Sequence, residues 1–423
     1  MSRLMKHSGV KWIGDIPEHW KTGRYKYYVI AEKGKLPTTV NETGEGLPII
    51  GASEMNGKTP KLFTKEELPS CTKDDILILW DGANAGLIAH GFEGIVSSTS
   101  VVFRKVTDKL NSKYLFYQLK SEEPFFRDKV NGTTIPHMNN AYIDELCALI
   151  PPLHEQHTIV GFLDAKCNEI NTLVSLQEKM IDELQAYKQS VIIEAVTKGL
   201  IPNAKTKDSH QQWLGAIPSH WELRPLKYVF SHRREKNDPI KSKERLSLSI
   251  GAGVTLYSEK TTNLDRFKDD FTQYQLAYPN DIVLNCMNMI VGAVGRSDYF
   301  GCVSPVYYVI YPTYNDNPYY YAYLLNTPII RNVYHALGQG IYAIERGEGR
   351  VNTCRLKVPY EDFGRIEIPV PPLEEQQEIA DYLDKKCSEI DKLVSIKRQK
   401  IEELKDYKKS LIYEYATGKK QVI

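Results

Sequence analysis

The sequence predicts an α+β fold: two mixed α/β bodies joined by two long helices that pair as an antiparallel coiled coil, with a pseudo-two-fold internal repeat. The chain has 423 residues, about two to three times an ordinary domain. The segment Trp12-Ile-Gly-Asp-Ile-Pro-Glu-His-Trp20 recurs 201 residues later as Trp213-Leu-Gly-Ala-Ile-Pro-Ser-His-Trp221. The segment Pro151-Pro-Leu-His-Glu-Gln156 recurs 220 residues later as Pro371-Pro-Leu-Glu-Glu-Gln376. A tandem duplication explains both matches.

The order of domains follows from where these repeats begin and end. We expect a first body at 1–150, a central spacer helix at 151–198, a linker at 199–212, a second body at 213–370 and a C-terminal helix at 371–420. Each predicted helix follows a Pro-Pro pair, runs on without proline and ends at a glycine, Gly199 or Gly418. Proline stops the preceding segment, and glycine is the preferred residue after a helix end.

Apolar residues in both helices follow a heptad pattern, which predicts the coiled coil. We place a positions at Leu163, Ile170, Gln177, Leu184 and Val191 and d positions at Ile159, Lys166, Leu173, Met180 and Tyr187, with Val174 and Ile181 widening the stripe. The stripe recurs at Leu383, Ile390, Lys397, Leu404 and Leu411 and at Leu393, Lys400 and Tyr407. A helix of about 40 residues spans roughly 60 Å, so pairing of the two helices is favoured over packing of each on its own body.

Each body is predicted to contain strands followed by a helical, aromatic stretch. The strands are 75–79 and 100–103 in the first body and 281–284 and 306–311 in the second, and the helical stretches are 113–120 and 318–326. Elsewhere the bodies diverge while the helices agree. We interpret this pattern as two related recognisers with different targets.

Composition excludes several classes of protein. The chain is 42% hydrophobic and 25% charged, which is typical of globular proteins and not of disordered ones. Its seven cysteines are scattered without a C-x-x-C pair, so we expect neither a disulfide framework nor a zinc site. No apolar run reaches the 18 or so residues that a membrane span needs, and we expect a cytoplasmic protein without membrane contact.

The two repeated motifs and the long helices after them resemble the specificity subunit of type I DNA restriction-modification systems, over essentially the whole chain. The resemblance implies two target recognition domains, each reading one half of a bipartite site in double-stranded DNA. It also implies a scaffold for two modification (methyltransferase) subunits and, through them, restriction (endonuclease and translocase) subunits. The chain itself is then non-catalytic and binds no cofactor, and S-adenosylmethionine, ATP and Mg²⁺ are expected on the partner subunits.

Motifs of catalysis are absent from the sequence, in agreement with the resemblance. There is no G-x-x-x-x-G-K-[ST] phosphate loop, and Asn317-Pro-Tyr-Tyr320, the segment nearest to an adenine methyltransferase motif, lacks the second proline. An enzyme that both recognises and modifies DNA would need a methyltransferase or nuclease domain, for which the length and the motifs leave no room. A protein-only coiled-coil adaptor without DNA binding stays open as the alternative.

Candidate DNA contacts lie in the bodies, which hold a net charge of +4 because the first helix carries −3 and the second is neutral. Phosphate contacts require Lys or Arg. The candidates are Arg104, Lys105, Arg127 and Lys129 in the first body and Arg233, Arg234, Lys236, Lys241, Lys243, Arg245, Arg331, Arg346 and Arg350 in the second. Polar residues on loops are candidate readers of base edges. They are Asn84, Thr133 and Thr134 in the first body and Asn285, Asn288, Arg296, Gln339 and Tyr342 in the second.

Residues shared by both halves have a different expected role. Two recognisers of different DNA would not share base contacts, so Trp12, Trp20, Trp213, Trp221, His19 and His220 are expected to pack the bodies against the helices or a partner. The helix dipole stabilises carboxylates near the start of a helix. Glu155, Gln156, Glu375 and Gln376 at the two helix starts are the candidate partner contacts.

Overall fold

The computed structural model describes residues 3–10, 13–128, 146–260, 270–341, 345–346, 350–351 and 355–422. The chain divides into two compact units, residues 1–178 with 398–423 (unit 1) and residues 179–397 (unit 2). Each unit therefore contains one body, the beginning of one long helix and the end of the other.

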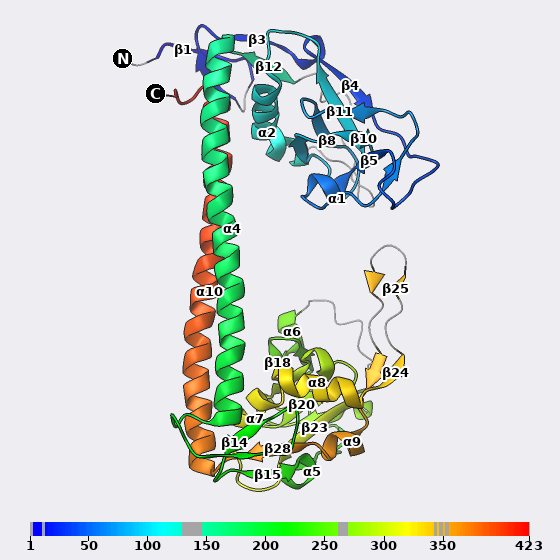
Figure 1. The fold of residues 1–423 in the computed structure, drawn as a ribbon, viewed down its shortest axis with the longest axis vertical. Coiled ribbons are helices and arrows are strands. Elements are labelled where there is room, and N and C mark those ends of the chain that lie inside the picture. Colours follow the sequence, from blue (N-terminus) through cyan, green and yellow to red (C-terminus); the bar gives the residue numbers. More distant parts are fainter. Residues whose placement is uncertain are drawn as a thin grey trace. The chain divides into compact units, whose positions relative to one another are not determined.

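An antiparallel four-stranded sheet forms the centre of the body in unit 1 (Figure 1). Its strands lie in the order β4 (Val29–Lys33), β11 (Ser100–Lys105), β8 (Ile76–Leu79) and β9 (Ile88–His90). A second sheet has the order β6 (Phe63–Thr64), β5 (Leu47–Ile50), β10 (Gly94–Val96) and β7 (Ser70–Cys71). The predicted strands 75–79 and 100–103 are confirmed as neighbours, because Val101 pairs with Ile78 and Phe103 with Ile76.

The body of unit 2 repeats this arrangement. Its central sheet has the order β16 (Phe230–His232), β23 (Tyr307–Pro312), β20 (Ile282–Asn285) and β21 (Val294–Arg296). The pair β19 (Gln275–Ala277) and β22 (Gly301–Val303) corresponds to β7 and β10, and the hairpin β17 (Leu246–Ser249) and β18 (Gly253–Leu256) is added. The sheet order therefore confirms the duplication where the sequences of the bodies no longer agree.

The helical stretches differ between the units. In unit 1 a single helix, α2 (Ser112–Asp128), follows β11. In unit 2 two helices occupy its place, α7 (Pro318–Leu324) and α8 (Pro328–Leu337). Pro328 corresponds in the repeat to Glu122 in the interior of α2. Proline is favoured at a helix start, and Pro328 follows the N-cap residue Thr327 of α8. Helix α2 continues through a proline of its own, Pro124.

Each body is attached by two antiparallel pairs of short strands. They are β1 (Met5–His7) with β2 (Asp15–Pro17) and β3 (Lys21–Arg24) with β12 (Cys147–Ile150) in unit 1, and β13 (Thr206–Asp208) with β14 (Ala216–Pro218) and β15 (Glu222–Pro225) with β28 (Glu367–Val370) in unit 2. The remaining short elements are η1 (Tyr25–Tyr27), α1 (Ala52–Met55), α5 (Leu226–Val229), α6 (Tyr257–Lys260), η2 (Phe271–Gln273), η3 (Met289–Val291), β24 (Gln339–Ile341), β25 (Glu345–Arg346), β26 (Arg350–Val351), β27 (Arg355–Lys357) and α9 (Tyr360–Gly364).

Two long helices, α4 (Leu153–Lys198) and α10 (Leu373–Ala416), confirm the predicted pair. In unit 1 the ring of Phe162 contacts that of Tyr415, and Lys408 donates a hydrogen bond to Asn171. In unit 2 Lys188 forms an ion pair with Asp391. From Phe162 to Asn171 the residue number rises along α4, while that of the contacting residue on α10 falls from Tyr415 to Lys408. The helices therefore run antiparallel in unit 1. Within the described residues no helix is long and apolar enough to cross a membrane.

The heptad assignment requires a correction. Leu173, Met180 and Tyr187, which we placed at d, are 40%, 40% and 55% exposed. The residues one position later form the seam instead, since Cys167 and Ile181 are buried and Val174 packs against the core. The second helix shows the same shift, with Cys387, Val394 and Ile401 buried and Leu393, Lys400 and Tyr407 exposed. The a positions are unchanged because a seam with spacings of four then three passes through them as well.

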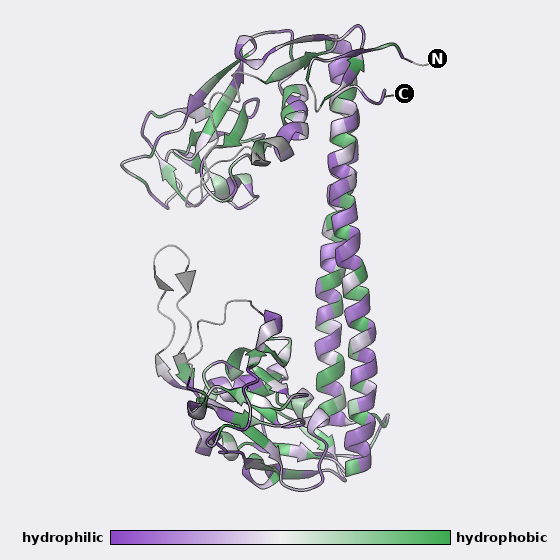
Figure 2. Ribbon diagram, turned by 180° about the vertical axis from the view of Figure 1, so that it is seen from behind, coloured by the Kyte–Doolittle hydropathy of each residue, from purple (hydrophilic) through white to green (hydrophobic). Residues whose placement is uncertain are grey.

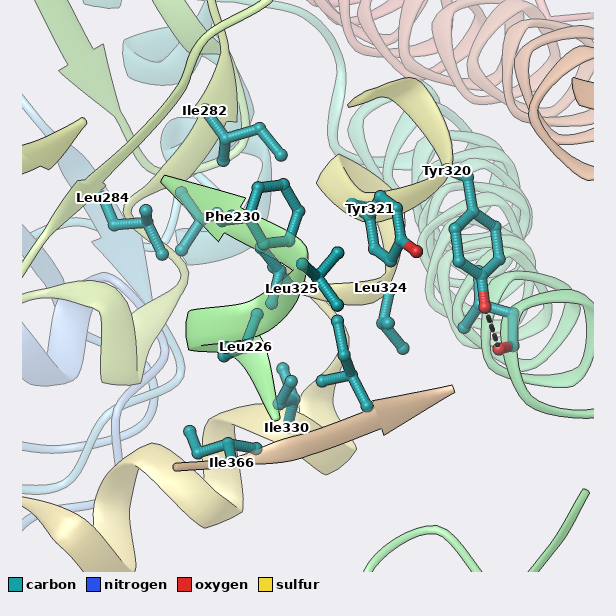
Figure 3. Packing of buried hydrophobic residues seen from close by; sticks show 14 of the residues in the cluster. Leu226, Phe230, Ile282, Leu284, Tyr320, Tyr321, Leu324, Leu325, Ile330 and Ile366 are labelled. Carbon is teal, nitrogen blue, oxygen red and sulfur yellow. Dashed lines mark hydrogen bonds between the residues drawn. The ribbon is translucent and has the colours of Figure 1, made fainter. Parts of the chain in front are cut away.

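Hydrophobic residues concentrate on the sheets of the bodies and on the helix ends that cover them (Figure 2). In unit 2, Ile282, Leu284 and Phe230 from the sheet belong to one cluster with Tyr320 and Tyr321 from α7. The ring of Phe230 contacts that of Tyr321, and Tyr320 lies beside the end of α4 (Figure 3). The same cluster includes Val191, Ile192, Ala195 and Val196 from the end of α4. Each body is thus held against its helix pair by one continuous core, which positions its loops.

Candidate nucleic-acid interface

The same carboxylate clamp fastens each body to the start of a long helix. In unit 1 Glu155 accepts a hydrogen bond from the indole of fully buried Trp20 at 3.0 Å and pairs with His19. In unit 2 Glu375 accepts one from buried Trp221 at 3.0 Å and pairs with His220 at 2.8 Å. We call these two sets of three residues the carboxylate clamps. The expectation that the shared Trp and His residues pack the bodies against the helices is confirmed for Trp20, Trp221, His19 and His220.

Of the other two tryptophans, Trp213 packs against the core of unit 2, and Trp12 lies outside the described residues.

Electrostatics keeps the Glu155 clamp charged. Burial would raise the pKa of Glu155, but hydrogen bonds from Trp20 and His19 and the charge of Arg3 outweigh it. The pKa of Glu155 therefore lies below its usual range. The carboxylates of the clamps bond inside the joints. Little of either side chain is accessible to a partner, since 23% of the Glu155 side chain and 12% of the Glu375 side chain are exposed.

Removing the clamp carboxylate should destabilise unit 1. We expect Glu155→Ala to lower the free energy of unfolding by about 1–3 kcal/mol, because the buried indole N–H loses its acceptor. Because the folded pKa is lowered, this stabilisation is present above the ordinary pKa of glutamate and is lost as pH falls through the lowered value. Urea unfolding at pH 7 and pH 4 measures both effects.

Glu169 supplies the control on the same helix, since it forms an exposed pair with Lys166. Glu169→Ala should change stability by about 0.5 kcal/mol or less. Equal losses in the two variants at pH 7 would show that the clamp does not hold the joint.

Gln156 and Gln376 form internal joints and require a correction, because we expected them to contact a partner. Both side chains are buried. The carboxamide oxygens accept from the backbone N–H of Asn111 and Asn317, each at 2.8 Å, and the amide groups donate to Pro151 and Pro371. A buried amide with its hydrogen bonds satisfied does not bind another chain. These residues tie α2 and α7 to the helix starts.

Three positions of the joint were missed by the sequence analysis, and each of them holds the same residue type in both units. Tyr114 and Tyr320 donate to the carbonyls of Ala416 and Val196, each at 3.0 Å. Tyr117 and Tyr323 donate to Asp164 and Asp384 at 2.6 and 2.7 Å. With Asn111 and Asn317 they form the pattern N-x-x-Y-x-x-Y, repeated at a spacing of 206 residues. That spacing is the signal that could have identified them; the matches at 201 and 220 residues concealed it.

Two of the predicted phosphate contacts are occupied within the bodies. Arg104 pairs with Glu32 at 2.7 Å and with Asp75 at 3.5 Å. Arg233 binds Asp281 through two hydrogen bonds of 2.6 and 3.0 Å and lies over the rings of Tyr278 and Tyr311. Asp75 and Asp281 are buried and correspond in the repeat, so each body needs one arginine to neutralise the same carboxylate. The structure gives Arg104 and Arg233 this internal role.

Exposed cations remain at other predicted positions. Lys105, Arg234, Lys241 and Lys243 are exposed. Arg234 donates to His232, and Lys241 pairs with Glu235. Arg127 lies on α2, and Arg346 and Arg350 are paired residues of β25 and β26. Lys129, Thr133, Thr134 and Tyr342 lie outside the described residues.

The predicted base readers on corresponding turns lie at the same end of the two sheets. Asn84 is exposed on the turn that joins β8 to β9. Asn288 is exposed on the turn that joins β20 to β21, and Arg296 ends β21 with its guanidinium 3.8 Å from the ring centre of Tyr319. Asn285 is half-buried, and its side chain accepts from the backbone of Met287. Gln339 is exposed on β24, away from this turn in the chain, and donates to Asp362. The turn between β8 and β9 and the turn between β20 and β21 therefore occupy corresponding positions in the two sheets and differ in sequence.

Comparison with known proteins identifies the same family twice within the chain. A family model described as the type I restriction modification DNA specificity domain matches residues 13–183 and 218–406. The specificity subunit of the type I restriction enzyme MjaVIII from Methanocaldococcus jannaschii is 27% identical over 429 residues, which cover 96% of this chain and 94% of that protein. The specificity subunit of the Escherichia coli enzyme EcoBI is 20% identical over 371 residues, 80% of this chain and 73% of its own.

The likeness extends to solved structures. A chain from a structural study of complex assembly and conformational transition in a type I restriction-modification system superposes with a TM-score of 0.65. It is 16% identical and covers 95% of this chain and 98% of its own length, so the likeness concerns the fold. Because the family model matches both halves, the chain belongs to the type I restriction-modification DNA specificity family.

Proposed function

We propose that this chain is a specificity subunit that recognises a bipartite DNA sequence, one half-site per body, and that it scaffolds two modification subunits and, through them, restriction subunits. One observation carries the proposal. The joints between body and helix pair agree residue by residue in the two units, whereas the turns at the sheet ends differ. A duplicated support with two different reading surfaces suits a target with two different halves.

The chemistry of the turns supports base recognition. Asn can form two hydrogen bonds with adenine, and Arg can do so with guanine, in the major groove. Asn84 in unit 1 and Asn288 in unit 2 are exposed on turns that a rigid sheet presents. A change in these turns alters the bases read without disturbing the buried joints, because none of the clamp residues lies on them.

Catalysis is assigned to partner subunits in this proposal. The specificity family is non-catalytic in itself. S-adenosylmethionine is expected on the modification subunits as the methyl donor, and ATP with Mg²⁺ on the restriction subunits. The carboxylate clamps, repeated in both units, give the chain two equivalent helix starts, which suits the binding of two copies of one modification subunit.

Mapping of methylated adenines in host DNA tests the proposal. With the gene present we expect one bipartite methylated sequence, and with the gene deleted that sequence should lose its methylation. The chain with its modification subunit should shift DNA of that sequence in a gel more strongly than unrelated DNA, and native mass spectrometry at saturation should show two modification subunits. A protein-only adaptor would bind no DNA with or without the modification subunit and would leave the methylation pattern unchanged.

A further inference from the structure

A cleft of about 840 Å³ lies within unit 2, where the end of α4 meets the body. Its helix side includes Gln185, Lys188 and Gln189, and its body side includes Arg296, Asn326 and Arg331. We call it cleft 2. Every one of these six side chains can donate hydrogen bonds.

A second cleft, of about 690 Å³, lies within unit 1, where the end of α10 meets the body. Its helix side includes Lys405, Lys408 and Lys409, and its body side includes Lys120. We call it cleft 1. The helix residues of the two clefts correspond at the 220-residue spacing, and Lys120 corresponds to Asn326 at the 206-residue spacing. The duplication has therefore placed a cleft at the same position in both units. Hydrogen-bond donors line both clefts, together with Asp384 and Asp391 in cleft 2 and Glu123 in cleft 1.

The helix lysines of cleft 1 can bind an anion, whereas Lys120 is paired with Glu123 on the body side. Lys408 donates to the amide of Asn171, which is not an acid. Lys405 and Lys409 pair with Glu402 and Asp406 one turn away on the same helix, and all four of these side chains are between 48% and 72% exposed. Exposed pairs of this kind contribute about 0.5 kcal/mol or less, so a phosphate can replace the carboxylate at little cost.

Arg331 supplies the corresponding charge in cleft 2. It donates to the amide oxygen of Asn326, and its Nε is buried without an acceptor among the described residues. Burial lowers the pKa of Arg331. The other cations of the cleft are paired, Lys188 with Asp391 and Arg296 with Asp298.

Cleft 2 is continuous with the turn expected to read bases. The guanidinium of Arg331 lies against Gly292, where an added Cβ would stand 2.7 Å from Cζ. Gly292 belongs to the turn that carries Asn288, and Arg296 lies at the end of the strand that follows this turn. A DNA backbone lying along the cleft would therefore bring its bases to this turn.

We propose that the two clefts bind backbone phosphates of the DNA beside each half-site. The inference rests on the proposed function and deepens it. Phosphate contacts fix the position of a protein on DNA and are the same for every sequence. The two clefts fit this role because they occupy the same position in the repeat, whereas base readers must differ between the bodies.

The salt dependence of DNA binding tests the clefts, measured on the complex with the modification subunit. In Lys405→Gln/Lys408→Gln/Lys409→Gln, the slope of log affinity against log salt should decrease by about 0.9 for each phosphate that the variant no longer binds. The decrease should be equal on cognate and unrelated DNA, and the methylated bases should not change. The control is Lys166→Gln/Lys386→Gln/Lys400→Gln, in which three paired helix lysines outside both clefts are replaced and the slope should be unchanged.

Arg331 is tested separately, because it also contacts the turn. Arg331→Gln should reduce the slope by about 0.9, the value for one phosphate, and Arg331→Lys should restore most of it, since the charge returns. If both variants change the methylated bases and leave the slope as it was, Arg331 positions the turn and binds no phosphate.

Three outcomes overturn the inference. An unchanged slope in the triple cleft variant would show that cleft 1 does not bind the DNA backbone. Loss of the modification subunit from this variant, seen by native mass spectrometry without a change in slope, would show that the cleft binds protein. If the complex of the modification subunit with the natural chain, without any substitution, binds no DNA at all, the proposed function is overturned, and this inference with it.

Discussion

A chain in which residues 25–146 replace residues 226–366 should direct methylation to a sequence whose two half-sites contain the same bases. The ends of the exchanged segment are defined by corresponding hydrogen bonds. Tyr25 donates from its backbone to Leu146, and Leu226 donates in the same way to Ile366. The short strand pairs outside these residues stay in place and hold the new body at its base.

The exchange is expected to fold because the transplanted body brings matching contacts. Tyr114 would meet the carbonyl of Val196, and Tyr117 would meet Asp384. In the natural units these bonds have nearly equal lengths, 3.0 Å for both members of the first pair and 2.6 and 2.7 Å for the second. No buried joint residue is left without a partner, which is the change that costs most stability.

The reciprocal exchange provides the control. With residues 226–366 in place of 25–146, the other half-site should be duplicated. Sequencing of methylated DNA decides the matter. A methylated sequence that keeps two different halves in either exchange would show that recognition lies outside the exchanged segments.

Lengthening both long helices should move the half-sites apart. The boundary between the units falls after Glu178 on α4 and after Lys397 on α10, so four residues inserted at both positions lengthen the pair while leaving each unit intact. Four helical residues add about 6 Å at 1.5 Å per residue. Since base pairs are about 3.4 Å apart, the unspecified spacer of the methylated sequence should grow by one or two base pairs.

Two further chains make this experiment decisive. Seven inserted residues keep the alternation of three and four along the seam and should add about three base pairs, whereas four leave a local stutter. Substituting the same four residues for existing ones keeps the length, and the spacer should not change. An active complex with longer helices and an unchanged spacer would show that the helices do not set the distance.

The sequence by itself determined the duplication, the long helices and the family. A Pro-Pro pair precedes the start of each long helix, and a glycine follows its end. The predicted helices at 151–198 and 371–420 therefore agree with α4 and α10 to within a few residues. These are local signals, because proline and glycine act through the backbone of their own neighbourhood. The repeated motifs needed no structure to be found.

Tertiary structure alone decided which helix residues face each other. Leu173 and Val174 are adjacent and both apolar, and spacings of three then four or four then three pass through the same a positions. The sequence pattern fits either choice. The position of the second helix selects the seam with Val174 and leaves Leu173 exposed.

Long-range pairing likewise decided which charges are free. Arg104 lies on β11, whereas Arg233 directly follows β16, yet each neutralises the corresponding buried aspartate. Because the arginine changed position between the halves, comparing the repeats position by position cannot reveal the match. The carboxylates that neutralise an arginine can come from distant parts of the chain, so its freedom to bind DNA depends on which strands are neighbours, and only the folded chain brings those strands together.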